Sequence, residues 1–249
     1  METERTALVL SAGGMFCAWQ AGVWSALAPR LRPEVVIGVS AGALNGWAIA
    51  AGCSPQQLEA WWLDPALAQF SRLRFPWPPW AGFLEPEPLR AVARRLAALP
   101  PRIELLIATT EIPALRPRLF RGHEARWEHL AATCAVPLCF PPVKLGGRWH
   151  VDGGLLGALP LWAIGEARVQ RAVAIDVLPQ PLSRWIAWMV GAVRRKARGV
   201  PEVPGEVRVE RIAPERPLGS LRDAIFWRRR NIERWIEAGR QAAERMRNI

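Results

Sequence analysis

Cysteine and histidine are scarce in this sequence, and their spacing excludes two classes of small protein. The 249 residues include four cysteines and three histidines, and no two cysteines form a C-x-x-C pair. Zinc modules need clustered Cys and His ligands, and disulfide-stapled domains need a dense cysteine framework. We therefore expect no metal, and we expect Cys17, Cys53, Cys134 and Cys139 to be reduced and mostly buried.

Lysine is also scarce, although the chain is strongly basic. Only Lys144 and Lys196 occur, so arginine supplies almost all of the positive charge in a formal net charge of +11. Residues 184–249 hold most of the surplus, with 15 arginines and one lysine against seven glutamates and one aspartate. A basic surface favours polyanionic partners. No nucleic-acid-binding motif accompanies the charge, so no nucleic acid partner is expected.

Long uncharged stretches are present, but their composition does not favour membrane spans. Residues 6–29 and 35–57 carry no charge and are long enough to cross a bilayer. Each has glycines and polar residues in its middle, and each divides into a short aliphatic run followed by a helical pattern. The N-terminus lacks the basic segment of a signal peptide. We expect a cytoplasmic protein with at most a peripheral contact to a membrane.

The hydrophobic pattern alternates between short apolar runs and amphipathic stretches. It predicts one α/β domain over residues 1–249, with a mostly parallel central sheet flanked by helices on both faces. Strands are predicted at 7–10, 35–39, 103–108, 172–177 and 207–212. Helices are predicted near 17–27, 43–51, 55–62, 88–98, 127–133, 161–167, 183–197 and 221–246. A hairpin is predicted at 143–151, with Gly146 and Gly147 in its turn.

A segment rich in proline and aromatic residues interrupts this alternation. The run Phe75-Pro-Trp-Pro-Pro-Trp80 cannot form a regular helix, because its prolines fix φ and remove N–H donors. Exposed aromatic side chains there would suit a lid or a membrane contact, whereas buried ones would cover the core. The sequence leaves both interpretations open.

A G-x-S-x-G motif joins a predicted strand to a predicted helix. Gly38-Val39-Ser40-Ala41-Gly42 has the strand–turn–helix context that a nucleophile elbow requires. Gly38 and Gly42 leave room on both sides of the tight turn, and the helix N-terminus stabilises negative charge nearby. Ser40 is therefore a candidate nucleophile. A plain strand-to-helix turn is the alternative.

Paired glycines occupy the turn after the first predicted strand. Gly13 and Gly14 would let backbone N–H groups face a cleft and stabilise an oxyanion. The turn has neither the Lys-Ser/Thr of a P-loop nor a complete G-x-G-x-x-G, so nucleotide binding is disfavoured and no cofactor is expected. We interpret Gly13 and Gly14 as candidate oxyanion-hole residues.

The residue that would activate Ser40 is harder to identify. An α/β-hydrolase carries its histidine late in the chain, whereas no histidine here lies beyond His150. Only four aspartates are available, and Asp152 follows the predicted hairpin and precedes Gly153 and Gly154. Taken alone, Asp152 would be read as a turn residue.

Together these motifs resemble the patatin-like phospholipase family over most of the chain. Residues 8–22 resemble its glycine-rich loop and first helix, residues 38–42 its elbow, and residues 131–154, with Pro160, its Asp-Gly-Gly segment. The resemblance implies a three-layer patatin-like fold, with the catalytic motifs within 8–160 and a basic helical part at 183–249. It also implies a Ser–Asp dyad in which Ser40 is the nucleophile and Asp152 the base, hydrolysing carboxylic esters of lipids as a phospholipase A does.

The glycine loop departs from the family pattern. Where the family reads Gly-Gly-Gly-x-Arg/Lys-Gly, this sequence has Ala12, then Gly13-Gly14-Met15, then Phe16 and Cys17. Two hypotheses follow: a serine lipid acyl hydrolase, or a patatin-fold protein that binds lipid or a partner with weak or lost catalysis. Because Phe16 occupies the position of the family's basic residue, Phe16→Arg is expected to raise or broaden esterase activity. If Phe16 packs in the core, the arginine would only destabilise the fold.

The C-terminal quarter is expected to touch anionic membranes. The apolar run Trp185–Val193 is too short to span a bilayer and ends in the basic cluster Arg194-Arg195-Lys196-Ala197-Arg198. Arg228–Arg230, beside Phe226 and Trp227, would add a second contact. Alternatively, the apolar side of the run packs on the sheet and the arginines are only solvated.

Overall fold

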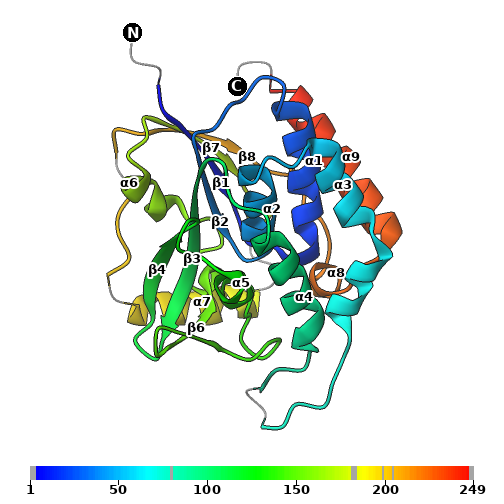
Figure 1. The fold of residues 1–249 in the computed structure, drawn as a ribbon, viewed down its shortest axis with the longest axis vertical. Coiled ribbons are helices and arrows are strands. Elements are labelled where there is room, and N and C mark those ends of the chain that lie inside the picture. Colours follow the sequence, from blue (N-terminus) through cyan, green and yellow to red (C-terminus); the bar gives the residue numbers. More distant parts are fainter. Residues whose placement is uncertain (1–3, 79–80, 181–183, 198, 204, 247–249) are drawn as a thin grey trace.

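One sheet with helices on both faces forms the centre of the molecule. The computed structural model describes residues 4–78, 81–180, 184–197, 199–203 and 205–246. Eight strands form one sheet. Seven of them are hydrogen-bonded neighbours in the order β5-β6-β3-β2-β1-β7-β8, and the eighth, β4, also pairs with β3. Helices cover the sheet on either side (Figure 1). The architecture is therefore the three-layer α/β arrangement expected from the sequence.

The strands agree with the predicted ones, with one addition. They are β1 (Thr6–Leu10), β2 (Val35–Val39), β3 (Glu104–Ile112), β4 (Arg116–Arg121), β5 (Val143–Leu145), β6 (Arg148–Asp152), β7 (Arg171–Ile175) and β8 (Arg208–Ile212). The pairs β1–β2, β1–β7, β2–β3 and β7–β8 are parallel, whereas β4 and β6 run antiparallel to β3. Sequence reasoning missed β4 because its charges and its proline are untypical of a strand, although an edge strand tolerates both.

Most of the helices lie where the hydrophobic pattern placed them. The helical elements are η1 (Gly14–Cys17), α1 (Ala18–Leu27), α2 (Ala41–Ala50), α3 (Pro55–Leu63), η2 (Pro65–Ser71), α4 (Pro86–Ala97), α5 (Trp127–Thr133), η4 (Gly153–Leu155), η5 (Leu161–Ala163), α6 (Ile164–Ala167), α7 (Arg184–Lys196), α8 (Leu221–Ile225) and α9 (Arg229–Glu244).

The single helix predicted over 221–246 is wrong in its middle. Phe226 and Arg228 have extended backbones between α8 and α9. The Trp227 amide donates to Ser71 Oγ (3.3 Å), and its indole N–H donates to the Trp62 carbonyl (3.0 Å). These long-range contacts break the helix. They also turn Trp227 toward the body of the protein, where a surface contact was expected.

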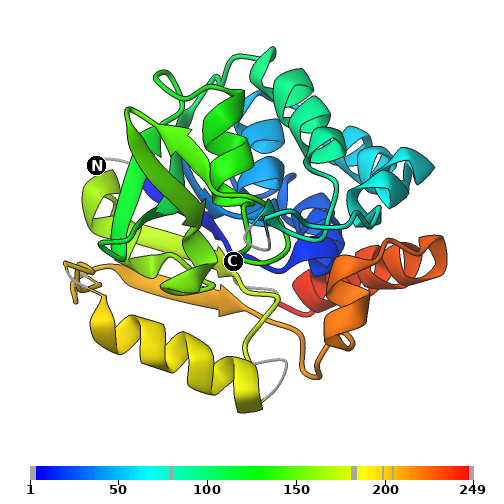
Figure 2. The same ribbon diagram turned by 90° about the horizontal axis from the view of Figure 1, so that it is seen from below.

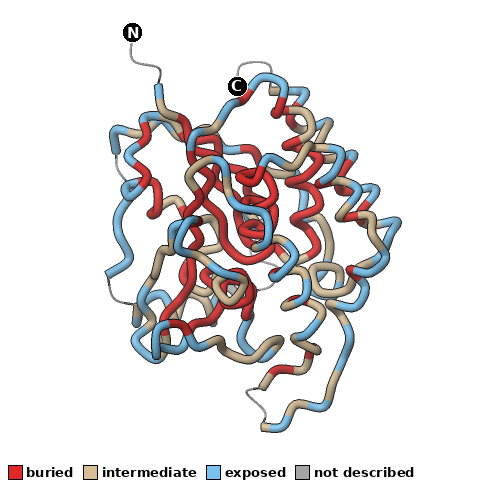
Figure 3. The backbone as a smooth tube through the Cα atoms, in the orientation of Figure 1, coloured by how far each residue is buried: buried red, intermediate tan, exposed pale blue. Residues whose placement is uncertain are grey.

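The sheet separates two hydrophobic clusters. The larger one packs one face of the central strands against α1, α2, α3, α4 and α9. The smaller one packs the opposite face against η5 and α6. Figure 3 shows the buried residues concentrated in the central strands and in α1 and α2. Strands covered on both faces read as continuous apolar runs, as β1 and β2 do.

The two long uncharged stretches are folded into this core. Residues 6–29 form β1, η1 and α1, and residues 35–57 form β2, α2 and the first turn of α3. Among the described residues, no helix is long and apolar enough to cross a membrane. The carboxyl ends of β1 and β2 point to the lower end of the molecule in Figure 1, and Figure 2 views the molecule from that end.

Candidate active site

Strands β2 and β6 meet end to end on one edge of β3. The last residue of β2, Val39, pairs with Ala108, and the last residue of β6, Asp152, pairs with the next residue of β3, Thr109. Both strands lie on the same edge, because β4 occupies the other edge of β3 from Leu106 to Glu111. The two strands run in opposite directions, so their ends face each other. This register brings Ser40, which follows Val39, beside Asp152.

Ser40 has the strained backbone of a sharp strand-to-helix turn. Its φ is +56°, a region that residues other than glycine rarely adopt. A Cβ on Gly38 would lie 2.6 Å from the Ala43 Cα, and a Cβ on Gly42 would lie 2.3 Å from the Ser11 carbonyl oxygen. Only glycine fits at either position. The motif glycines therefore let the turn form at the start of α2, whose N-terminus favours negative charge.

Thr133 at the end of α5 holds this turn in place. Its hydroxyl oxygen accepts a hydrogen bond from the Ser40 amide (2.9 Å) and its hydroxyl donates to the Ala108 carbonyl (2.6 Å). Two residues later, the Ala135 carbonyl accepts a hydrogen bond from the Asp152 amide (3.0 Å). One segment thus positions both residues. Sequence reasoning did not identify Thr133, because its only signal was a polar residue at the end of a short helix.

Asp152 is a buried carboxylate with one oxygen free. Its side chain is only 4% exposed, and Oδ1 accepts from the Gly154 amide (2.7 Å). Oδ2 is buried without a hydrogen-bond partner among the described residues. Burial raises the pKa of the Asp152 carboxyl from 3.8 to about 6, and the Ser40 side chain and the Gly154 amide oppose this rise.

The Ser40 hydroxyl and the Asp152 carboxylate are neighbours without a regular hydrogen bond between them. The hydroxyl lies close enough to lower the pKa of the carboxyl, yet Oδ2 lacks a partner of good geometry. Catalytic hydrogen bonds are often loose until substrate binds. The arrangement leaves Oδ2 as an acceptor for a proton from Ser40.

The glycine loop lies between α2 and the Asp-Gly-Gly turn. A Cβ on Gly154 would meet the Ala12 Cβ at 3.0 Å, which places the loop directly beside Asp152. Gly14 has a φ of +56°, and a Cβ there would lie 2.3 Å from the Ala224 carbonyl oxygen. Neither the Gly13 nor the Gly14 amide donates to another described residue. Both N–H groups are therefore available to an anion.

Phe16 points away from the site. It is fully buried and packs edge-to-face on Trp235 of α9, with the ring centroids 5.0 Å apart. Phe16 occupies the sequence position of the family's basic residue, but η1 turns its side chain into the core. The interpretation in which Phe16 packs in the core is correct.

The other titratable candidates have partners elsewhere. His150 Nδ1 is 2.9 Å from the Thr109 hydroxyl, and burial lowers the pKa of this histidine. Asp176 is ion-paired with Arg211. Asp64 caps the N-terminus of η2, and the Asp223 carboxylate accepts from the amide of Ser220, the N-cap of α8. Within the described part of the chain, no three His, Cys, Asp or Glu side chains gather closely enough to hold a metal ion.

The four cysteines are free thiols, and the charge of Asp152 acts on three of them. Cys17 and Cys134 are buried, whereas Cys53 and Cys139 are half-buried. Burial raises the pKa of Cys17, Cys134 and Cys139, and the negative charge of Asp152 raises it further. These three thiols therefore stay protonated and carry no charge at neutral pH.

A network of buried hydrogen bonds connects the glycine loop to the neighbouring helices. Gln20 donates to the Ser11 carbonyl (2.9 Å), and Asn45 donates to the Gln20 side chain (2.9 Å) and the Cys17 carbonyl (2.9 Å). The Trp62 indole completes the chain by donating to Asn45 (2.8 Å). Satisfied buried networks of this kind fix one arrangement of the elements that they join. The network ties the loop to α1, α2 and α3.

A comparison of the sequence with known protein families identifies the family of this chain. The sequence model of the patatin-like phospholipases matches residues 8–164, more than half of the chain. The chain belongs to the patatin-like phospholipase family. The matched region contains both strands that meet on β3, the glycine loop and the Asp-Gly-Gly turn. Family membership supports lipid hydrolase activity in general, and it confirms the resemblance inferred from the motifs.

Two solved structures align with nearly the whole of this chain at low sequence identity. The crystal structure of VipD from Legionella pneumophila aligns over 98% of this chain and 66% of its own, with a TM-score of 0.49 and 11% identity. That of the type III effector protein ExoU aligns over 97% of this chain and 52% of its own, with a TM-score of 0.45 and 14% identity. This chain thus spans about two thirds of the length of VipD and about half of the length of ExoU. No curated protein matches it significantly.

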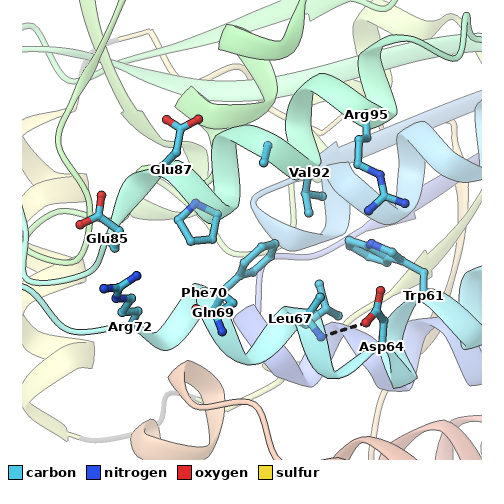
Figure 4. Close-up of a pocket in the computed structure, with 13 residues that line it drawn as sticks. Trp61, Asp64, Leu67, Gln69, Phe70, Arg72, Glu85, Glu87, Val92 and Arg95 are labelled. Carbon is cyan, nitrogen blue, oxygen red and sulfur yellow. Dashed lines mark hydrogen bonds between the residues drawn. The ribbon is translucent and has the colours of Figure 1, made fainter.

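A cavity of about 500 Å³ lies apart from this family site, between η2 and α4. Figure 4 shows its apolar floor, with Trp61, Leu67, Phe70 and Val92, and charged side chains such as Arg72 and Glu85 at its rim. Neither Ser40 nor Asp152 lines it. Ser40 and Asp152 are instead almost closed to solvent, since they are only 5% and 4% exposed.

Proposed function

We propose that this protein is a serine acyl hydrolase that cleaves carboxylic ester bonds of lipids with Ser40 and Asp152. The observation that carries the proposal is the meeting of β2 and β6 on β3. It leaves a buried carboxylate oxygen without a partner beside a serine on a strained turn. A structural aspartate would use both oxygens, as Asp176 does with Leu178 and Arg211.

The first half-reaction is acyl transfer to the serine. Asp152 Oδ2 takes the proton of the Ser40 hydroxyl as Oγ attacks the ester carbonyl carbon. The Gly13 and Gly14 amides and the N-terminus of α2 stabilise the resulting oxyanion. Collapse of the tetrahedral intermediate breaks the C–O bond, and Asp152 returns the proton to the departing alcohol.

The second half-reaction releases the acid. Asp152 takes a proton from a water that attacks the acyl-serine, and collapse of this second intermediate restores the Ser40 hydroxyl with that proton. A carboxylate of ordinary pKa is a weak base for these steps. The burial that raises the pKa of Asp152 to about 6 makes it a stronger base that is still ionised at neutral pH.

The test compares variants of the two residues on a soluble short-chain aryl ester and on phospholipid. Ser40→Ala and Asp152→Asn are each expected to lower kcat/KM by at least about a thousandfold, because each removes a group that acts in every step. His150→Asn is the matched control: His150 is on the same strand two residues earlier, and it is expected to retain most activity. Labelling of Ser40 by a fluorophosphonate provides an independent readout.

The outcomes separate this proposal from its alternative. Near-full activity of Asp152→Asn combined with loss in His150→Asn would exclude the dyad. A folded wild-type chain that neither hydrolyses esters nor reacts with the fluorophosphonate would instead support a patatin-fold protein that binds lipid or a partner without catalysis.

The location of the enzyme is part of the same proposal. We expect peripheral contact with anionic membranes, supported by the exposed Arg194, Arg195 and Lys196 at the end of α7. Helix α7 contacts η4, next to Asp152, and its Trp188 is exposed. The side chains of Trp185, Ile186 and Met189, like residue 198, lie outside the described part of the structure.

A further inference from the structure

A projecting loop with exposed aromatic side chains joins η2 to α4. We call its described residues, 72–78 and 81–85, the aromatic loop. Phe75 is 88% exposed, Trp77 82% and Leu73 62%. Figure 1 shows this segment extending beyond the lower end of the molecule, the end to which β1 and β2 direct their carboxyl ends. Of the two interpretations of this segment, the structure therefore shows exposed aromatics. Trp80 lies outside the described residues.

Backbone hydrogen bonds hold the root of the loop. Leu73 and Leu84 form an antiparallel bridge, and the Arg74 amide donates to the Phe83 carbonyl (2.9 Å). The Arg74 guanidinium donates to the carbonyls of Ala81 and Gly82 across the loop. Pro76 and Pro78 fix their own φ angles near the tip. The aromatic side chains are thus presented by a preorganised backbone, so little conformational entropy is lost when they are buried.

The loop is connected directly to the segment that positions the catalytic pair. The Phe83 amide donates to the Leu138 carbonyl and the Leu84 amide to the Cys139 carbonyl, both at 2.9 Å. Ala135, three residues before Leu138, accepts from the Asp152 amide. Leu138 itself is 67% exposed and extends the apolar surface. The aromatic side chains and the buried dyad are therefore parts of one connected end of the molecule.

Basic groups and a further aromatic side chain share this end. Arg116 and Trp149 pair with Glu111 and Ile112, the last residues of β3, so both lie at the carboxyl end of the sheet. Trp149 is half-exposed, and the Lys144 ammonium lies 5.9 Å from the centre of its ring. Exposed Arg72 stands at the root of the aromatic loop. Aromatic rings flanked by basic groups match the chemistry of a lipid headgroup layer.

We propose that the aromatic loop inserts Phe75 and Trp77 into the surface of a lipid bilayer and so seats the active-site end of the protein on the membrane. Two fully exposed aromatics on a fixed loop are unfavourable in water, and burying them in the interface removes this cost. The inference rests on the proposed lipid ester substrate, which is itself held in such a surface. It differs from docking by the basic end of α7, because apolar insertion needs no anionic lipid.

The test measures vesicle binding in the Ser40→Ala background, so that hydrolysis does not alter the lipid. Phe75→Ser combined with Trp77→Ser is compared with Leu99→Ser, a matched control. Leu99 is also exposed but lies just before β3, at the opposite end of the strands. On neutral phosphatidylcholine vesicles at high salt, the loop variant is expected to bind at least about tenfold more weakly than its parent, and Leu99→Ser equally well.

Activity on two kinds of substrate separates this proposal from the proposed function. In the wild-type background the loop variant is expected to keep its kcat/KM on the soluble aryl ester and to lose most of its hydrolysis of vesicle phospholipid. If the wild-type protein hydrolysed neither substrate, the proposed function would fail, but the comparison of vesicle binding would still test the role of the loop. Absence of vesicle binding by the parent, or equal binding by the loop variant, would overturn the proposal. The proposal would also be overturned if the loop variant had a lower molar mass in solution than its parent but bound vesicles equally well. The loop would then join two copies of this chain.

Discussion

At the scale of single residues, the buried carboxylate of Asp152 lowers the stability of the fold. A carboxylate that is buried with one unpartnered oxygen is costly to ionise, and this cost appears as the raised pKa. Hydrogen bonds from the Asp152 amide to the Ala135 carbonyl and from the Gly154 amide to Oδ1 hold the residue in this buried position. In the proposed mechanism, the same burial that destabilises the ionised fold strengthens Asp152 as a base.

Asp152→Asn is accordingly expected to stabilise the protein while it removes activity. The folded chain holds the Asp152 proton more tightly than the unfolded chain, so the free energy of unfolding of the wild type falls as pH rises from about 4 to 6. An asparagine does not titrate and can still accept from the Gly154 amide. Urea unfolding should show a gain of roughly 3 kcal/mol at pH 7 that vanishes below about pH 4. A constant difference at every pH would contradict the assignment.

Phe16→Arg is expected to unfold the protein without activating it. The arginine would be buried against Trp235, where no acidic partner faces residue 16 among the described contacts. Burial of an unpaired charge costs about 3 kcal/mol or more, whereas Phe16→Leu, the control, should cost about 1 kcal/mol. Thermal unfolding followed by circular dichroism measures both variants. A folded Phe16→Arg with raised kcat/KM would show that η1 can rearrange toward the site.

At the scale of elements, α1 and α9 pack at a crossing that leaves no room for side chains. A Cβ on Gly22 would lie 1.8 Å from the Ile236 carbonyl oxygen, and a Cβ on Gly239 would lie 2.1 Å from the Trp19 carbonyl oxygen. The two glycines therefore let the helix backbones touch. Helix α1 also carries Gln20, whose side chain donates to the Ser11 carbonyl in the glycine loop. A change in the position of α9 would therefore be transmitted to the candidate site through α1.

Gly239→Ala is expected to push the two helices apart. The methyl group would meet backbone, which cannot rotate away, so we expect a loss of about 1–3 kcal/mol in the free energy of unfolding. Gly191→Ala in α7 is the matched control, because its Cβ would meet only the Arg195 guanidinium at 3.6 Å. That variant should be neutral or stabilising by up to about 1 kcal/mol. Equal effects in both helices would show that close packing is not the cause.

At the scale of the whole molecule, the basic C-terminal part is built into the fold. Ile232, Trp235 and Ile236 of α9 are buried in the same cluster as Phe16 and Trp19. The region matched by the family model ends at residue 164, before β7, β8 and α9. The catalytic motifs therefore depend on elements that lie outside the matched region.

A chain that ends at residue 220 is expected to lose cooperative folding, since it would expose the apolar face of α1. The control is a chain that ends at residue 246 and keeps α9, which should unfold as the full chain does. Circular dichroism, thermal melting and fluorophosphonate labelling compare the two. A cooperative melt of the shorter chain with retained labelling would show that residues 1–220 are sufficient.

The sequence determined the features that depend on local pattern. Continuous apolar runs predicted the central strands, and the glycines around Ser40 and Asp152 predicted two tight turns, because steric limits on φ and on side-chain room act within a few residues. The order of the three motifs was sufficient to indicate the family. Composition also gave the concentration of positive charge in the last quarter.

Only the tertiary structure decided what depends on contacts between distant segments. Nothing near Thr133 in the sequence indicates that it bonds to the Ser40 amide, 93 residues away. The direction of Phe16, the break at Phe226–Arg228 and the exposure of Phe75 and Trp77 likewise depend on which elements pack beside them. The adjacency of Ser40 and Asp152 is set by the register of β2 and β6 on a third strand. Local sequence selects the turn, but the free energy that fixes its neighbours comes from burial shared across the whole sheet.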